Sequence, residues 1–262
     1  MRKGALAAGL LAAVVTLAAA YVQVGAVAGE LAGRRGTPVV VAHRAGAALG
    51  PENTLQALEA SIAAGADMVE VDVRLTRDGV PVLLHDSTLR RTAGVERPVR
   101  ELTLEELEKI DGSVPTLDSF LKAAKGRVPV MVEVKTGDRE EELLRGVIRL
   151  IYANAMERDC VVACGRLAPL ERCRALAPEL GRVYITRMVY PGLGRVASAQ
   201  GYSLDFRRAN GAAVVQARAE GRGLYVWTVN DREDLRRMAA LGPDGIITDN
   251  PALARALLDG AG

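Results

Sequence analysis

Short apolar segments with the two-residue period of β-strands alternate along the chain with longer segments that have the period of amphipathic helices. From residue 38 onward, this alternation occurs eight times once the return strand of one hairpin is set aside. The predicted strands cover residues 39–43, 68–75, 128–135, 160–164, 182–186, 202–206, 224–229 and 245–248. Eight strand–helix units in roughly 225 residues predict an α/β fold, a TIM (β/α)8 barrel. A doubly wound open sheet has the same alternation, but no glycine-rich phosphate-binding fingerprint follows the first strand.

Residues 68–86 predict a β-hairpin appended after strand two. Glu70 and Asp72 alternate with valines, so both carboxylates should lie on one face of the first strand. An Asp-Gly pair marks the turn, and too few residues separate the two strands for a parallel crossover. The strands are therefore expected to be antiparallel, which returns His85 to the neighbourhood of the two carboxylates. The charged segment 89–114, next along the chain, is expected to be irregular, with one short helix.

The N-terminal part of the chain has a different pattern, because residues 5–28 form an almost unbroken apolar run after Arg2 and Lys3. The run approaches the ~20 residues that cross a bilayer, and it has no polar face. It predicts an N-terminal hydrophobic helix, either a retained signal anchor or a signal peptide cleaved after residue 28. The expected organisation is a signal anchor or signal peptide over 1–29, a linker over 30–37 and the barrel domain over 38–262. The expected location is the cell membrane, single-pass with an extracytoplasmic catalytic domain, or the exterior after cleavage.

Composition excludes some classes of function. Lys and Arg number 34 against 32 for Asp and Glu, and the resulting net charge of +2 argues against an electrostatic nucleic-acid binder. Three cysteines cannot form a complete set of disulfides. Cys160 and Cys164 would lie about 13 Å apart on one strand, which is too far to bridge. No structural disulfide is expected.

Polar residues gather at one end of the predicted strands. In a barrel, the active site is built at the C-terminal ends of the strands. The residues expected there are His43, Arg44, Glu70, Asp72, His85, Glu133, Lys135, Trp227, Asn230 and Asp249. The opposite ends of four strands carry apolar residues: Val39, Met68, Val128 and Leu224. This asymmetry predicts an active site at the charged rim.

The residue types at the rim indicate acid–base and metal chemistry. The only two histidines of the chain, His43 and His85, fall there, and histidine titrates near neutrality, as a general acid and a general base must. Glu70, Asp72 and Glu133 form an all-oxygen set that suits a hard divalent cation, Mg²⁺ or Ca²⁺. The alternative interpretation of these three carboxylates is a cluster of salt bridges with neighbouring cations.

The neighbouring cations and the single tryptophan have two interpretations as well. Arg44 and Lys135 are suited to an anionic substrate such as a phosphate. They are also, with Arg74, the cations that would form the salt bridges. Trp227 fits either a core position or a wall against an apolar part of the substrate.

At these residues the sequence resembles the glycerophosphodiester phosphodiesterase family, from about residue 38 to the C-terminus. The matching motifs are His43-Arg44 with residues 51–54, Glu70-Val-Asp72, residues 76–79, His85-Asp86, Glu133-Val-Lys135, residues 226–230 and residues 244–249. The resemblance implies a barrel, a divalent cation, two catalytic histidines and hydrolysis of glycerophosphodiesters to sn-glycerol 3-phosphate and an alcohol.

Carried over motif by motif, the resemblance implies a role for each site residue. The metal ligands would be Glu70, Asp72 and Glu133, and the acid–base pair would be His43 and His85. The substrate contacts would be Arg44, Lys135 and Trp227. Glu52 would act indirectly, by supporting these residues without contacting the substrate. Two alternative functions stay open: phospholipase D-like cleavage of lysolipids, and an inactive, membrane-tethered protein that binds glycerophosphoryl groups. The expected partners are a small glycerophosphodiester or lysolipid and, through the N-terminal helix, a membrane.

Three departures from the family pattern bear on specificity. Ala45 occupies a position that is usually glycine; if that position requires a positive φ, Ala45 costs about 1 kcal/mol or more and displaces Arg44. Cys164-Gly165 replaces a Ser-Phe pair, which removes an aromatic wall. The segment after His85 is short, and substrate choice is expected to reside there. Cys164 is the only candidate for a side-chain nucleophile at the rim.

Overall fold

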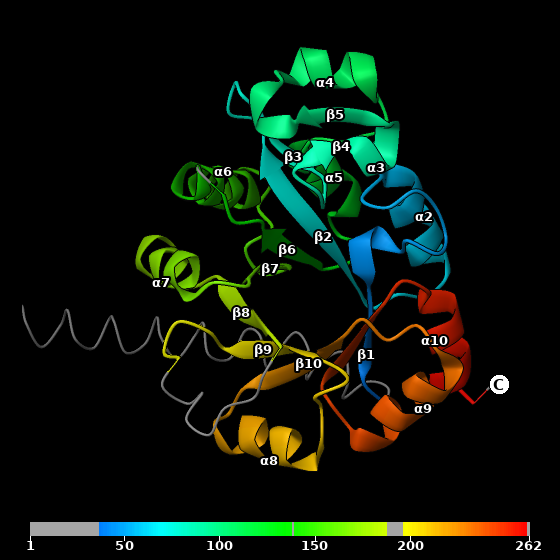
Figure 1. Cartoon of the computed structure of the whole chain (residues 1–262). Helices are drawn as coiled ribbons and strands as arrows, with labels where there is room; N and C mark the ends of the chain where they lie inside the picture. The colour runs from blue at the N-terminus through cyan, green and yellow to red at the C-terminus, as the bar shows by residue number, and fades with distance from the viewer. Residues whose placement is uncertain (1–36, 138, 188–195, 261–262) are drawn as a thin grey trace, which may run out of the picture.

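The computed structural model describes residues 37–137, 139–187 and 196–260. Eight parallel strands form its central sheet: β1 (Val39–Ala42), β2 (Met68–Leu75), β6 (Val130–Val134), β7 (Cys160–Cys164), β8 (Gly181–Thr186), β9 (Gly201–Asp205), β10 (Gly223–Trp227) and β11 (Gly245–Thr248). Strand β1 pairs with both β2 and β11, which closes the sheet into a barrel (Figure 1). The predicted TIM barrel is confirmed, and the open doubly wound sheet is excluded.

Helices surround this barrel (Figure 1). They are α2 (Leu55–Ala63), α5 (Leu117–Ala124), α6 (Glu140–Ala153), α7 (Leu167–Leu176), α8 (Gly211–Ala219), α9 (Arg232–Leu241) and α10 (Pro251–Leu258). Five of them begin after a capping side chain that accepts a backbone hydrogen bond: Thr54, Thr116, Asn210, Asp231 and Asn250. A helix was expected after every strand, but the described residues between β8 and β9 contain none.

The segment after β2 confirms the predicted hairpin and corrects the prediction for residues 89–114. Strand β3 (Pro81–Leu83) pairs antiparallel with β2. The expected short helix is present as α4 (Leu104–Ile110), but the rest is more regular than predicted. It consists of β4 (Thr88–Leu89), α3 (Arg90–Ala93), β5 (Val95–Pro98) and the 3₁₀ turn η2 (Val99–Glu101). Because β4 and β5 are only two and four residues long, they leave no readable period in the sequence.

Alternation along each strand separates the outer core from the barrel interior. The valines of β2 pack outward in the core cluster shared with the helices, whereas Met68 joins the interior cluster. The interior is so closely packed that a methyl group on Gly245 would come within 2.4 Å of the ring of Tyr225. On β2, the inward-facing series continues from Met68 through Glu70 to Asp72. The fold therefore brings carboxylates to the mouth of an otherwise apolar interior.

The cysteine prediction is confirmed within the described residues, because Cys160, Cys164 and Cys173 are all free and buried. The predicted hydrophobic N-terminal helix (1–29) lies outside the described residues, as does the linker except for Thr37. In the part of the chain that the structure describes, no helix is long and apolar enough to cross a membrane.

Candidate active site

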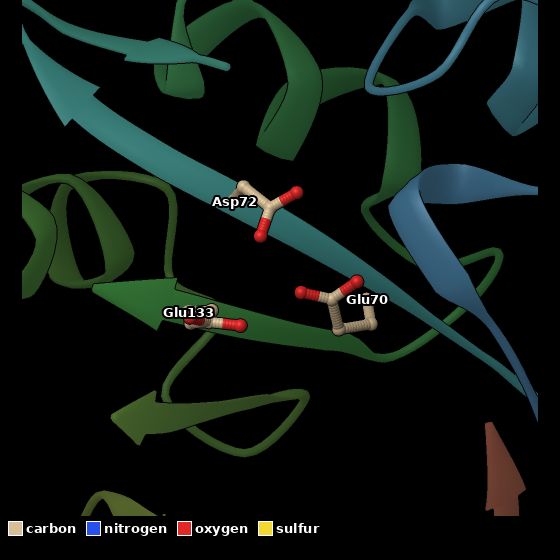
Figure 2. Close-up of side chains that lie close together, drawn as sticks. All are labelled: Glu70, Asp72 and Glu133. Carbon is tan, nitrogen blue, oxygen red and sulfur yellow. The ribbon is translucent and has the colours of Figure 1, made fainter. Parts of the chain in front are cut away.

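Three carboxylates converge at the mouth of the barrel from two neighbouring strands (Figure 2). Glu70 and Asp72 lie on β2 and Glu133 on β6, and the register of the two strands pairs Asp72 with Glu133. One oxygen from each carboxylate lies within 4.8 Å of the others. Oxygen Oε1 of Glu70 is buried and has no hydrogen-bond partner among the described residues. A buried carboxylate oxygen without a partner, beside two further carboxylates, fits a hard divalent cation.

Charge distinguishes the two carboxylates of β2. Burial and the neighbouring charge of Asp72 raise the pKa of Glu70 to about 8. Burial also opposes the charge of Asp72, but Lys135 and His85 outweigh it and hold the pKa of Asp72 below its usual range. A hydrogen bond of 2.9 Å from Asn53 Nδ2 to Asp72 Oδ2 acts in the same direction. Asp72 is therefore ionised at neutral pH, whereas its surroundings oppose the negative charge of Glu70, which a bound cation would favour.

The two predicted phosphate contacts already form ion pairs with these carboxylates. Lys135 Nζ lies 2.7 Å from Asp72 Oδ1 and 2.5 Å from Glu133 Oε1. The backbone N–H of Arg44 donates to Glu70 at 2.9 Å, and its guanidinium lies 3.5 Å from Asp72. The salt-bridge interpretation of the carboxylates thus holds for Arg44 and Lys135. It is wrong for Arg74, which donates to the backbone carbonyl of His85 at 2.6 and 2.9 Å instead.

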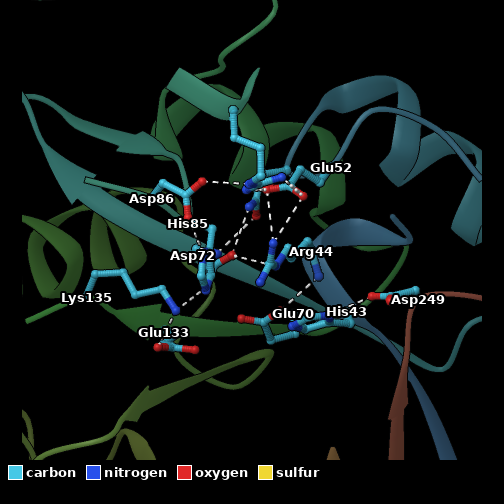
Figure 3. A network of polar contacts seen from close by, with 12 residues as sticks. His43, Arg44, Glu52, Glu70, Asp72, His85, Asp86, Glu133, Lys135 and Asp249 are labelled. Carbon is cyan, nitrogen blue, oxygen red and sulfur yellow. Dashed lines mark hydrogen bonds and ion pairs between the residues drawn. The ribbon is translucent and has the colours of Figure 1, made fainter. Parts of the chain in front are cut away.

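Each histidine is held by a carboxylate at the same ring nitrogen (Figure 3). The Nδ1 atom of His43 lies 2.6 Å from Asp249, and that of His85 lies 2.8 Å from Asp86. Since Nδ1 is occupied, Nε2 is the nitrogen left for proton transfer. Burial lowers the pKa of His43, but the hydrogen bond to Asp249 and the negative charge of Glu70 outweigh burial and raise it.

A chain of ion pairs connects one histidine to Arg44. Glu52 accepts hydrogen bonds from Arg44 Nη1 at 3.1 Å and from Arg91 Nη2 at 2.6 Å. The Nε atom of Arg91 in turn donates to Asp86 at 2.6 Å, and Asp86 holds His85. Glu52 therefore supports the substrate contact Arg44, as expected. Arg91 was missed, because nothing in the sequence pattern places α3 over the turn that carries Glu52.

Four further residues were not assigned roles from sequence. Asp86 and Asn53 stand inside the motifs that carry the family resemblance. Their position next to His85 and Glu52 was the signal in the sequence that could have identified them. Asp249 was expected at the rim, but its contact with His43 joins residues 206 positions apart. Asn230 Nδ2 donates to the second oxygen of Asp249 at 2.5 Å, which fixes that carboxylate in turn.

A cavity of about 490 Å³ opens over these groups. It is lined by both histidines, by Arg44 and Lys135, by Glu70 and Glu133, and on another side by Trp227. The indole of Trp227 donates to the backbone carbonyl of Ser203 at 2.9 Å, which orients the ring. Trp227 packs against the interior cluster and also lines the cavity, so both interpretations of this residue hold.

Two of the departures from the family pattern have structural outcomes. Ala45 has a φ of 61°, so the position does require a positive φ. Arg44 nevertheless lies in the site, since its N–H bonds Glu70. Cys164 is buried with its Sγ atom 3.4 Å from the carbonyl of Val134, and burial raises the pKa of its thiol to about 11. A buried, protonated thiol is not an activated nucleophile.

Comparison with known proteins agrees with this geometry. Residues 43–253 match the model of the glycerophosphoryl diester phosphodiesterase family. The chain belongs to this family of enzymes. It is 32% identical over 233 residues to the glycerophosphodiester phosphodiesterase of Caldanaerobacter subterraneus subsp. tengcongensis, a match that covers 81% of this chain and 94% of the relative. The resemblance read from the motifs is thereby confirmed.

Two other matches extend the comparison. A mouse lysophospholipase D is 28% identical over 273 residues, which cover 84% of this chain and 82% of that protein. A phosphodiesterase of Oleispira antarctica, solved in complex with the product sn-glycerol-3-phosphate, superimposes with a TM-score of 0.80. That match has 24% identity and covers 85% of this chain and 97% of the solved one, and it supports the fold.

Proposed function

We propose that the chain hydrolyses glycerophosphodiesters to sn-glycerol 3-phosphate and an alcohol, with a divalent cation, Mg²⁺ or Ca²⁺, as cofactor. The observation that carries the proposal is the cluster of three carboxylates beneath a cavity that two carboxylate-held histidines and two cations line. Membership of the family and the similarity to a relative of that name support it.

In this proposal, Glu70, Asp72 and Glu133 hold the cation. The bound cation supplies stabilisation of the charge on the phosphate oxygens. Arg44 and Lys135 bind the same phosphate, since both line the cavity beside the carboxylates. Their ion pairs hold the side chains in place before substrate arrives, which favours a fixed orientation of the phosphate.

The two histidines carry the protons in two steps. One takes a proton from the glycerol hydroxyl beside the phosphoester, and the oxygen of that hydroxyl attacks phosphorus. The other gives a proton to the oxygen of the departing alcohol as its bond to phosphorus breaks. Water then opens the resulting cyclic phosphate with the roles of His43 and His85 reversed. The state of Cys164 supports a route without a side-chain nucleophile.

Phospholipase D-like cleavage of lysolipids is the second candidate, favoured by the similarity to the mouse lysophospholipase D. A lysolipid with a free hydroxyl beside its phosphoester is open to the same two proton transfers. An inactive binding protein is the third alternative, and a turnover assay distinguishes it from both enzymes.

The test is a product assay over glycerophosphodiesters and lysolipids, with Mg²⁺ and Ca²⁺ compared. We expect release of glycerol 3-phosphate from glycerophosphocholine. A diester without a hydroxyl next to its ester should react much more slowly, and equal rates on both diesters would argue for direct attack by water. Absence of turnover on every substrate, in protein with native circular dichroism, would contradict an enzymatic function and leave only binding.

The apolar run over residues 5–28 supports a separate proposal, a membrane-anchored protein with its catalytic domain outside the cytoplasm, or a secreted one. The full chain should then fractionate with membranes or appear outside the cell. Recovery of the uncleaved full-length chain in the soluble cytoplasmic fraction would contradict the proposal.

A further inference from the structure

A second, smaller cavity of about 160 Å³ lies beside the cavity over the carboxylates, and Lys135 lines both. Its walls come from the ends of β2 and β6, from the start of α6 and from the segment after His85, which contributes Ser87, Val99 and Arg100. In Figure 1 this segment lies over the end of β2, and its turn η2 packs against that strand. Substrate choice was expected to reside in this segment, and the smaller cavity is a place where the segment meets the catalytic strands.

The register of β2 and β6 brings two cations side by side at this cavity. Arg74 stands two residues beyond Asp72 on β2, and Lys135 stands two residues beyond Glu133 at the end of β6, so each lies on the same face as its carboxylate. Because the register pairs Asp72 with Glu133, Arg74 is level with Lys135. At strand rise, both positions are about 6.6 Å further along than the carboxylates. A group bound in the smaller cavity would therefore lie just outward of the site proposed for the scissile phosphate.

Positive charge predominates around the smaller cavity. The described residues that line it include four cations and one carboxylate: Arg74, Arg100, Lys135, Arg139 and Glu140. The carboxylate of Glu140 already pairs with Arg166 at 3.1 Å. Lys135 pairs with the site carboxylates, and Arg139 pairs with Glu142 at 2.5 Å. The excess of positive charge therefore comes from the two remaining arginines.

Arg74 is the more informative of these two arginines. Its Nε and Nη2 atoms both donate to the backbone carbonyl of His85, and within the described residues its Nη1 atom makes no hydrogen bond and its guanidinium no ion pair. Burial lowers the pKa of Arg74, so its surroundings oppose the positive charge that a bound anion would favour. Ser87 and Thr136 add hydroxyl groups to the wall. Guanidinium and hydroxyl donors together suit the oxygens of a phosphate.

We propose that the smaller cavity is a subsite for a second phosphate group, carried by the alcohol portion of the substrate, so that the enzyme prefers glycerophosphodiesters whose alcohol is itself phosphorylated. The inference rests on the proposed function, because the scissile phosphate must occupy the larger cavity. Its own basis is the excess of positive charge around a cavity that shares Lys135 with the site. A diester with an unphosphorylated alcohol has no use for that charge.

The test compares two substrates that differ by one phosphate, glycerophosphoinositol and glycerophosphoinositol 4-phosphate. Release of glycerol 3-phosphate gives kcat/KM for each substrate. The readout is the ratio of the two values, because a change that only slows the chemistry lowers both alike. We expect the wild type to prefer the phosphorylated substrate at least about tenfold, as charge-assisted hydrogen bonds to a phosphate would produce.

Two variants and one control locate the origin of this preference. Arg100→Ala should lower the ratio at least about threefold, because it removes one cation of the cavity without touching His85. Arg74→Gln should also lower the ratio, and it should slow both substrates because Arg74 holds the backbone of His85. Arg97→Ala is the control, because Arg97 is an exposed arginine on β5 that lines neither cavity. It should leave the ratio unchanged.

Each other outcome has a defined meaning. A smaller ratio in an active wild type, or turnover of glycerophosphocholine without turnover of the phosphorylated substrate, would overturn the subsite and leave the proposed function standing. A preference that survives either Arg100→Ala or Arg74→Gln, or that Arg97→Ala lowers equally, would have its origin outside this cavity and would also overturn the inference. A wild-type protein inactive on all three diesters would overturn the proposed function and this subsite together.

Discussion

Arg91 provides a sharp test of the site, because one exposed side chain connects two parts of the catalytic arrangement. It donates one hydrogen bond to Asp86 at 2.6 Å and two to Glu52 at 2.6 and 2.8 Å. Asp86 holds His85, and Glu52 pairs with Arg44. Replacing Arg91 with alanine removes all three bonds without touching a residue that is expected to contact substrate.

The expected loss is much larger for catalysis than for stability. The Arg91 side chain is 47% exposed, and exposed ion pairs contribute about 0–1 kcal/mol to folding. Removing a residue that orients the residues of a metal site typically costs about 10–100-fold in activity. At about 1.4 kcal/mol per tenfold, this is about 1.4–2.7 kcal/mol of transition-state stabilisation. We therefore expect kcat for Arg91→Ala to fall 10–100-fold with little change in the unfolding midpoint.

The assay is steady-state release of glycerol 3-phosphate, with Arg90→Ala as the matched control. Arg90 is the neighbouring residue on α3, is 79% exposed and pairs with Glu96 at 3.3 Å, away from the site. Its loss should change kcat less than about twofold. Arg91→Lys should fall between the two, since one ammonium cannot reproduce the bidentate bonds of a guanidinium.

Equal kcat values for Arg91→Ala and Arg90→Ala would refute this role of Arg91. A second check uses the His85→Ala background. There the orienting role of Asp86 is lost, so the further effect of Arg91→Ala should be smaller than in the wild type. Fully additive effects on kcat would show that Arg91 does not act through His85.

Two further predictions concern the metal site and the core. Because the pKa of Glu70 is raised to about 8 in the metal-free protein, protons compete with the cation below that pH, and the affinity for the cation should fall by up to about tenfold for each pH unit below 8. Calorimetry in buffers of different ionisation enthalpy should show that cation binding releases a proton. A cation affinity that does not change between pH 6 and pH 8 would contradict this prediction. Gly245→Ala should lower the free energy of unfolding by about 1–3 kcal/mol, since the added methyl group would overlap the ring of Tyr225. The measurement is denaturant unfolding, with Gly137→Ala as the control because position 137 has open space around it. Equal unfolding midpoints for the two variants would contradict the prediction.

The barrel could be predicted because its strands have a strong period. Strands β2 and β7 begin and end at the predicted residues, since their runs of β-branched and small apolar residues stop at turn-forming segments. The small sheet of β4 and β5 could not be predicted in the same way. Its stability comes from a local apolar cluster that includes Leu89 and Leu107, and residues that far apart carry no shared period.

The site could be predicted as far as strand ends determine it. Once the barrel order is assumed, Glu70, Asp72 and Glu133 must meet, because β2 and β6 are neighbours. Contacts made by loops depend on conformations that local sequence does not specify. Two contacts of this loop-dependent kind are the hydrogen bond between His43 and Asp249 and the one between Glu52 and Arg91.

The central claim is that the carboxylates of β2 and β6 hold a cation that hydrolysis requires. The measurement is turnover of glycerophosphocholine by metal-stripped protein, with and without added Mg²⁺ or Ca²⁺. We expect no turnover in chelator, recovery on adding a cation, and no recovery in folded Asp72→Asn. His43→Ala and His85→Ala should still bind the cation and lose about 10²–10⁴-fold in kcat. Full activity of the stripped wild-type protein in chelator would contradict the claim.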